Sequence, residues 1–106
     1  MEESIKILLA GFEMDPAERV IVDNTIKNYV RKIKERTSYE ELKLTLKKSR
    51  HGETYLHEVQ GELFSGKWRL SANEKKYNLL SALSEVFEKI LKEIEHKKRT
   101  ARQNTQ

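Results

Sequence analysis

The stretch SANEKKYNLLSALSEVFEKILKEIEHKK, residues 71–98, decides the fold because it carries the longest helical periodicity in the chain. Its apolar residues recur at spacings of three, four and seven, so they share one face of a helix with about 3.6 residues per turn. They are Tyr77, Leu80, Leu83, Phe87, Ile90, Leu91 and Ile94, and Leu79, Ala82 and Val86 widen the stripe. The S-x-x-E spacing of Ser71 and Glu74 predicts a capping box at the start, with Asn73 as a second candidate N-cap. A stripe this broad needs a sheet or another helix to bury it.

The chain before this helix supplies four strands and one more helix. Asp15 and Pro16 predict a helix start, as N-cap and first helical residue, and that helix runs to about Arg36. The strands are expected at Ile5–Ala10, a short apolar run that fits a buried strand or, alternatively, the start of a helix; at Leu42–Lys48, which alternates; at Thr54–Phe64, with a bulge at Gly61; and at Lys67–Ala72. Residues 49–53 are expected to form a hairpin loop, and Ser65-Gly66 a tight turn.

The order strand, helix, three strands, helix predicts a two-layer α+β sandwich. The first helix crosses over to make the first two strands parallel, and hairpins add antiparallel neighbours. Both helices then lie on one face of a four-stranded mixed sheet. We expect one domain over residues 1–98 and a basic, disordered tail over residues 99–106.

Composition excludes several classes of protein. The chain has 106 residues, no cysteine, and no apolar run of the roughly 20 residues that a membrane span needs. It also has no secretory signal pattern, so we expect a cytoplasmic protein that does not interact with membranes. Without cysteine, disulfides, thiol catalysis and thiolate metal sites are excluded.

The basic residues are segregated although most of the chain is neutral. Of the 21 basic residues, four follow residue 96, whereas all 17 acidic residues precede it, so residues 1–96 have no formal net charge. Residues 27–36 hold five cations against Glu35 alone, and residues 43–50 hold four cations and no acid. Such a run is either a solvated face or a surface that binds phosphates by releasing counterions.

No motif for catalysis is present. His57-Glu58 begins like a zincin H-E-x-x-H, but Gly61 stands where the second histidine belongs, and the stretch is predicted to be a strand. There is no glycine-rich phosphate loop and no serine in a nucleophile elbow. We therefore expect a protein that is not an enzyme, with no metal, no cofactor and no small-molecule substrate.

The segment LFSGKWRLSANEKKYNLLSALSEVFEKILKEIEHKK, residues 63–98, together with the order of elements, resembles the ribosome hibernation-promoting factors, also called sigma-54 modulation proteins. That family ends its last strand in small residues, followed by a polar turn, a tyrosine and an apolar helix with a basic end. Ser71-Ala72, residues 73–76, Tyr77 and the following helix stand in those places. The resemblance covers about residues 5–98, and the chain departs from it at Lys75-Lys76, where the family commonly has acids, and in a second helix diluted by glutamates.

The resemblance implies a fold related in shape to double-stranded-RNA-binding domains. It also implies binding to the small ribosomal subunit and its rRNA, and inhibition of translation in stressed or resting cells. On this basis we expect phosphate contacts from the two helices and the tail. In the first helix they are Lys27, Arg31 and Lys34; in the second helix they are Lys89, Lys92, Lys97 and Lys98; and in the tail they are Arg99 and Arg102.

Two rival functions remain open at this stage. The first is a protein-interaction or self-association module, with a homodimer formed through the outward face of the sheet. That face is expected to carry Lys43, Thr45, Lys47, Lys67 and Arg69, joined by Glu58 and Gln60. The second is a small enzyme of unknown type, which bound metal or a stoichiometric small molecule in the purified protein would reveal.

Overall fold

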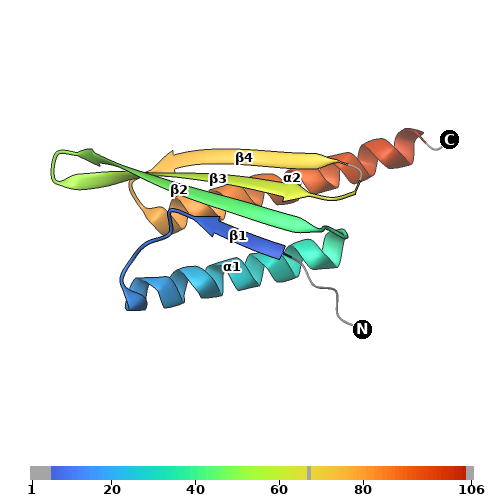
Figure 1. Cartoon of the computed structure of the whole chain (residues 1–106). Helices are drawn as coiled ribbons and strands as arrows, with labels where there is room; N and C mark the ends of the chain where they lie inside the picture. The colour runs from blue at the N-terminus through green and yellow to red at the C-terminus, as the bar shows by residue number, and fades with distance from the viewer. Residues whose placement is uncertain (1–5, 67, 105–106) are drawn as a thin grey trace.

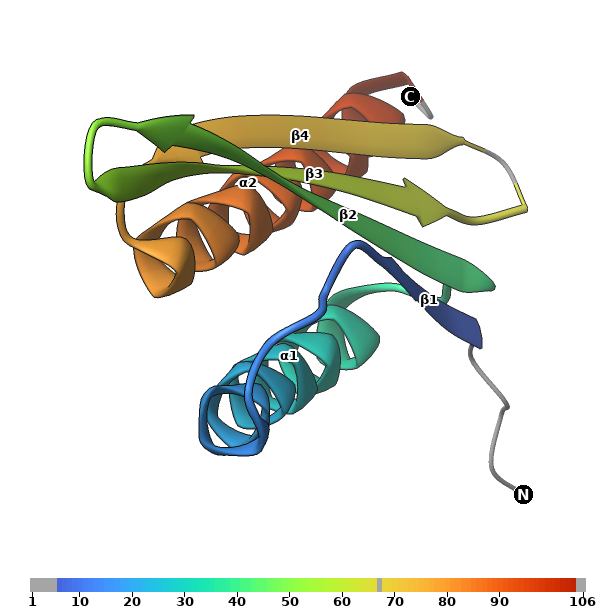
Figure 2. The ribbon, with the colours of Figure 1, turned by 60° about the vertical axis from the view of Figure 1, so that its left-hand side comes forward.

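Four strands form one mixed sheet, and both helices lie on the same side of it (Figure 1, Figure 2). The structure, a computed structural model, describes residues 6–66 and 68–104, with side chains as far as residue 100. The elements are β1 (Lys6–Ala10), α1 (Pro16–Arg36), β2 (Glu41–His51), β3 (Thr54–Phe64), β4 (Arg69–Lys76) and α2 (Leu79–Asn104). In the sheet β1 is parallel to β2, and the other neighbours are antiparallel. The predicted α+β sandwich, in β-α-β-β-β-α order, is confirmed.

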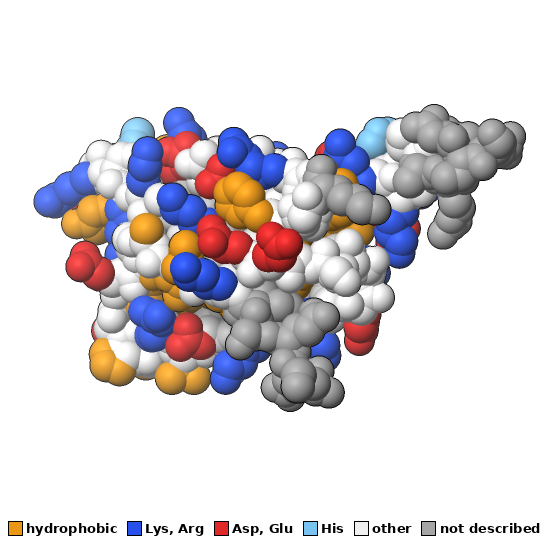
Figure 3. Space-filling model, turned by 45° about the vertical axis from the view of Figure 1, so that its right-hand side comes forward, with side chains coloured by type: hydrophobic (Ala, Val, Ile, Leu, Met, Phe, Trp, Pro, Cys, Tyr) orange, Lys and Arg blue, Asp and Glu red, His pale blue; other side chains and the backbone are white. Residues whose placement is uncertain are grey.

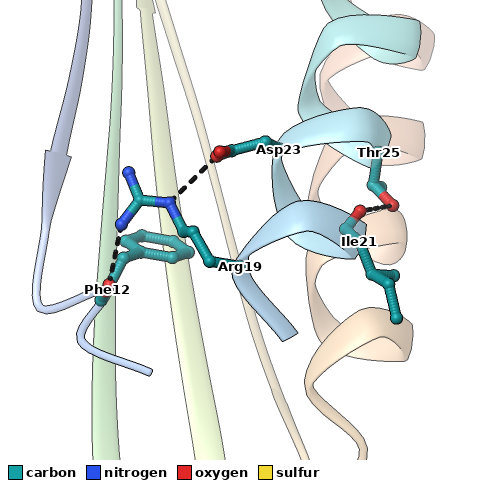
Figure 4. Close-up of polar contacts among 5 residues, drawn as sticks. All are labelled: Phe12, Arg19, Ile21, Asp23 and Thr25. Atoms are coloured by element: carbon teal, nitrogen blue, oxygen red, sulfur yellow. Dashed lines mark hydrogen bonds and ion pairs between the residues drawn. The ribbon is translucent and has the colours of Figure 1, made fainter. Parts of the chain in front are cut away.

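Helix α1 begins and ends where the sequence predicts. The Oδ1 atom of Asp15 accepts a hydrogen bond of 3.0 Å from the backbone N–H of Glu18, and Pro16 occupies the first turn. One turn further on, the guanidinium of Arg19 donates to the carbonyl of Phe12 at 3.1 Å and to Asp23 at 3.0 Å (Figure 4). These bonds tie the β1–α1 connection to the helix. The buried face of α1 consists of Val22, Ile26, Val30 and Ile33.

The boundary between β4 and α2 is not where the periodicity places it. The sequence predicts a helix from Ser71, but residues 69–76 pair with β3, and α2 begins at Leu79. The N-cap is Asn78, whose Oδ1 accepts from the backbone N–H of Ser81 at 2.8 Å. Because β4 is an edge strand with neighbours on one side only, it tolerates the polar residues that suggested a turn.

Two further expectations about this region are wrong. Tyr77 falls between β4 and α2, where the residue is 61% exposed, so it does not belong to the core. At the other end, α2 continues to Asn104, beyond the predicted helix end at Lys98, and residues 105–106 lie outside the described residues. The helix continues because no glycine or proline interrupts residues 95–104.

Gly61 fills a role different from the predicted bulge. The register runs without interruption through Gly61, which pairs with Leu44 on β2 and with Ala72 on β4. The glycine is buried, and a Cβ atom there would lie 2.7 Å from Cγ1 of Val86 on α2. The missing side chain therefore lets α2 approach the sheet closely.

The first strand and the hairpin also differ from expectation. The sequence predicts a buried strand here, but Ile7 and Leu8 are 40% and 37% exposed because β1 is the sheet's edge and only β2 flanks it. Ile5 lies outside the described residues. Strand β2 continues to His51, so the loop predicted at residues 49–53 reduces to the two residues Gly52 and Glu53. Gly52 has a φ of 65°, which suits the first central position of such a turn.

Candidate nucleic-acid interface

The three cations predicted on α1 share one exposed side of that helix. Lys27, Arg31 and Lys34 are exposed, and their i, i+4 and i+7 spacing keeps them together. Tyr29 and Arg36, which contact α2, lie on a different side of α1. None of the three cations forms an ion pair with a described carboxylate. Their charges therefore remain available to a partner.

The contact between the helices is built around Tyr29. Its ring stacks on Phe87 of α2, with centroids 4.7 Å apart and planes 1° from parallel, and its hydroxyl donates to Oε2 of Glu88 at 2.9 Å. Burial and the hydrogen bond to Glu88 raise the pKa of Tyr29 above its ordinary value. The Nζ atom of Lys32 lies 4.9 Å from the centroid of the same ring. In the sequence, Glu88 is one of the glutamates that dilute the basic charge of the second helix. In the structure, its partner is the hydroxyl of Tyr29.

A groove lies along the C-terminal half of α2, beside the last residue of α1. We call it the helix groove; it has a volume of about 560 Å³ and is lined by Arg36, Glu88, Leu91, Lys92, Glu93, Glu95, His96 and Arg99. Nε of Arg36 lies 3.6 Å from Glu95, and Nζ of Lys98 donates to the carbonyl of Arg36 at 3.1 Å. Two of the predicted cations, Lys92 and Arg99, therefore meet Arg36 in a groove of mixed charge.

Lys89 faces a different part of the molecule. Its Nζ atom lies 2.5 Å from Oε2 of Glu74 and donates to the carbonyl of Asn73 at 3.2 Å, both on β4. The hydrogen bond from Lys89 lowers the pKa of Glu74. Lys89 thus ties α2 to the edge strand instead of joining the cations of α1.

The nine predicted residues therefore separate into distinct places. Lys27, Arg31 and Lys34 lie on α1, Lys92 and Arg99 line the helix groove with Lys98 beside it, Lys89 faces β4, and Lys97 is exposed on α2. The side chain of Arg102 lies outside the described residues. Sequence reasoning missed Arg36, although its position seven residues after Tyr29 places both on the side of α1 that meets α2.

The outward face of the sheet carries charges that alternate in sign. Lys43 pairs with Glu62 in the register, Thr45 with Gln60 and Lys47 with Glu58. Arg69 lies 3.6 Å from Glu62, and Asn73 donates to Glu58 at 2.9 Å, whereas Lys67 lies outside the described residues. Basic and acidic side chains are likewise interspersed on the face shown in Figure 3. This surface is therefore internally compensated.

The histidine motif has no metal-binding geometry in the structure. His57 lies on β3, as predicted, and its Nδ1 atom is 2.8 Å from the carbonyl of Tyr77. Among residues 6–66 and 68–104, no group of three or more His, Cys, Asp or Glu side chains gathers as metal ligands would. No helix in the described part of the chain is both long enough and apolar enough to cross a membrane.

Comparisons with known proteins identify the fold. No family model matches the chain, and no curated protein matches it in sequence. Among solved structures, it is similar to the N-terminal domain of Protein Y from Thermus thermophilus. The two are 16% identical, the TM-score is 0.55, and the match covers 89% of this chain and 98% of that domain.

Proposed function

We propose that this protein is a ribosome-associated factor that binds rRNA of the small subunit and inhibits translation in stressed or resting cells. The observation that carries the proposal is the shared fold, which spans nearly all of the Protein Y N-terminal domain. The resemblance of residues 63–98 to the ribosome hibernation-promoting factors supports the same role. The proposed activity is binding in the cytoplasm, without catalysis, metal or cofactor.

The side of α1 that carries Lys27, Arg31 and Lys34 supports an RNA-facing role for this helix. These cations are exposed, project from a rigid element and form no ion pair with a described acid. Lysine and arginine presented in this way bind phosphates by releasing counterions from the RNA. We assign the first phosphate contacts to them.

The helix groove would add contacts at the far end of the same layer. Lys92 and Arg99 line it, with Arg36 as an addition that the structure suggests. Lys97, Lys98 and Arg102 would extend the contact along α2. Lys89 contributes least in this proposal, because its ammonium group is already held by Glu74 and the carbonyl of Asn73.

Sedimentation tests the proposal directly. Lysate is run through a sucrose gradient at low and at high magnesium concentration, and the protein is located by blotting. Co-migration with small subunits is expected, as is its loss in the variant Lys27→Glu/Arg31→Glu/Lys34→Glu. Wild-type protein found only at the top of the gradient under both conditions would contradict the proposal and favour the alternative, self-association through the outward face of the sheet.

A further inference from the structure

The β2–β3 hairpin extends past both helices as a two-stranded arm (Figure 1, Figure 2). We define the arm as residues 48–57. Strand β1 ends where Ala10 faces Thr45, and β4 ends where Lys76 faces His57, so residues 49–56 have no third strand beside them. This length of two-stranded ribbon contributes little to the core, which raises the question of what it contacts.

The inward face of the hairpin changes from buried apolar residues to cations and rings beyond Leu46 on β2 and Val59 on β3. Along β2, the inward residues Leu42, Leu44 and Leu46 are buried, and the next two in the same alternation are Lys48 and Arg50. Along β3, the buried Val59 gives way to His57 and then Tyr55 on that face. The register sets Tyr55 opposite Arg50 and His57 opposite Lys48, so cations and rings are cross-strand neighbours.

The cations of this face form no ion pair with a described acid. Nε of Arg50 donates to the carbonyl of Gly52 at 3.1 Å, and Nζ of Lys48 reaches the carbonyl of Glu13 at 3.4 Å. Both contacts are to neutral backbone groups, so both positive charges persist. Lys76, opposite His57 on β4, adds a third cation to the same face. The nearest acid of β4, Glu74, is paired with Lys89, and the charge of Lys76 also helps to lower the pKa of Glu74.

Exposed aromatic rings accompany these cations. The side chain of Tyr55 is 49% exposed in the middle of the arm. At the base of the arm Tyr77 is 61% exposed, and it meets edge-on, at 6.3 Å between centroids, the ring of His51, which the strand alternation places on the face opposite Arg50. Proteins recognise single-stranded nucleic acid with this combination of a solvent-exposed ring and cations that form no ion pair. The bases stack on the ring, and the phosphates contact the cations.

We propose that the arm binds an unpaired RNA strand, with a base stacked on Tyr55 and phosphates held by Lys48, Arg50 and Lys76. A duplex fits less well because its bases are already stacked on one another. The proposal rests on the proposed function only for the choice of RNA as the nucleic acid. The arm is also separate from the α1 and helix-groove residues to which we assign subunit binding.

Fluorescence anisotropy with a labelled, unstructured 12-nucleotide RNA and the full chain tests this proposal. We expect Tyr55→Ala to weaken binding at least about fivefold, since stacking on an aromatic ring is worth about 1–3 kcal/mol per base. Tyr55→Phe should keep wild-type affinity because it retains the ring. A blunt 12-base-pair RNA duplex should bind equally well to wild type and Tyr55→Ala.

The charge contribution has a matched control. Lys48→Gln/Arg50→Gln should flatten the log–log salt slope of binding by about 1.4, at about 0.7 per phosphate contact in a single strand. Lys6→Gln/Lys43→Gln removes the same net charge from exposed lysines elsewhere in the sheet and should leave the slope unchanged. Circular dichroism melting confirms that each variant is folded.

The outcomes separate this proposal from the previous one. Wild-type affinity and salt slope in both Tyr55→Ala and Lys48→Gln/Arg50→Gln would overturn the arm proposal, even if the protein sediments with small subunits. Loss of oligonucleotide binding in these folded variants would uphold it, even if sedimentation shows no ribosome association.

Discussion

The two helices lie on the same sheet, but they use their charged residues in different ways. Helix α2 buries eight apolar residues between Leu79 and Ile94, and α1 buries four between Val22 and Ile33. Lys89 of α2 is held by β4, and Lys98 by the last residue of α1, whereas the three cations of α1 have no described acidic partner. Counting lysines on a helix therefore does not locate a binding surface; the fold decides which charges remain available.

The largest effect should come from the unpaired cations of α1. Lys27→Gln/Arg31→Gln/Lys34→Gln should flatten the salt slope of small-subunit binding by about 2–3, at about 0.9 per phosphate contact. The wild-type slope should be about −4 to −5, for roughly 4–6 phosphates neutralised. Binding is measured at several salt concentrations.

Lys6→Gln/Lys43→Gln/Arg69→Gln is the matched control for this experiment. It removes the same charge from exposed residues outside α1 and should preserve the slope. If the α1 variant is folded and retains the wild-type slope, its helix is not the RNA-facing surface, and the contrast between the two helices loses its functional meaning.

The stability of the fold should depend on the buried residues of α2 and not on the exposed ring that precedes this helix. Phe87 of α2 is fully buried and stacked on Tyr29, so Phe87→Ala should lower the free energy of unfolding by about 3–5 kcal/mol. Tyr77→Ala, at an exposed position, should change it by less than about 0.5 kcal/mol. Urea denaturation measures both. A large loss from Tyr77→Ala would place that ring back in the core, as the helical periodicity first suggested.

The sequence predicts the fold well where local signals and tertiary structure agree. The Asp15-Pro16 cap and the alternation from Leu42 place α1 and the start of β2 correctly because each depends on neighbouring residues alone. The predicted position of the β4–α2 boundary is wrong because Ser71 and Asn78 are equally suitable N-caps. Pairing of β4 with β3, a tertiary interaction, selects Asn78.

The candidate site is less predictable for the same reason. The spacing of Lys27, Arg31 and Lys34 shows that they share a side of α1, because that depends only on helical geometry. Nothing in the sequence pairs Lys89 with Glu74, which lies on a different element, or Arg36 with Glu95, 59 positions away. Those contacts exist only after the elements have packed, and they remove Lys89 from the available charges.

Hydrogen bonding is incomplete at Tyr39, in the connection between α1 and β2. Its ring is buried, its hydroxyl has no hydrogen-bond partner among the described residues, and burial raises its pKa to about 12. Because the folded pKa exceeds that of the unfolded chain, full stability should hold below about pH 10 and fall as the pH rises towards 12. Tyr39→Phe should lessen this alkaline loss and, by removing an unsatisfied hydroxyl, leave neutral stability unchanged or higher. Thermal melts from pH 7 to 11 measure it; an identical alkaline loss in the variant would show that Tyr39 is not its source.

The smallest effect should separate the lysines of the two helices. Lys89→Ala removes the partner of Glu74 and should lower the free energy of unfolding slightly, whereas Lys27→Ala should leave it unchanged. The pKa of Glu74 lies below its ordinary value of 4.5 in the folded protein, so its stabilising contribution is present above that pH and lost as the pH falls through the folded pKa. The gap in stability between wild type and Lys89→Ala should therefore narrow below about pH 4.5, while Lys27→Ala should follow wild type at every pH. Urea titrations from pH 3 to 7 make the comparison. Equal stability of the two variants across that range would mean that the Lys89–Glu74 contact does not stabilise the fold, and that α2 holds its lysines no more firmly than α1 does.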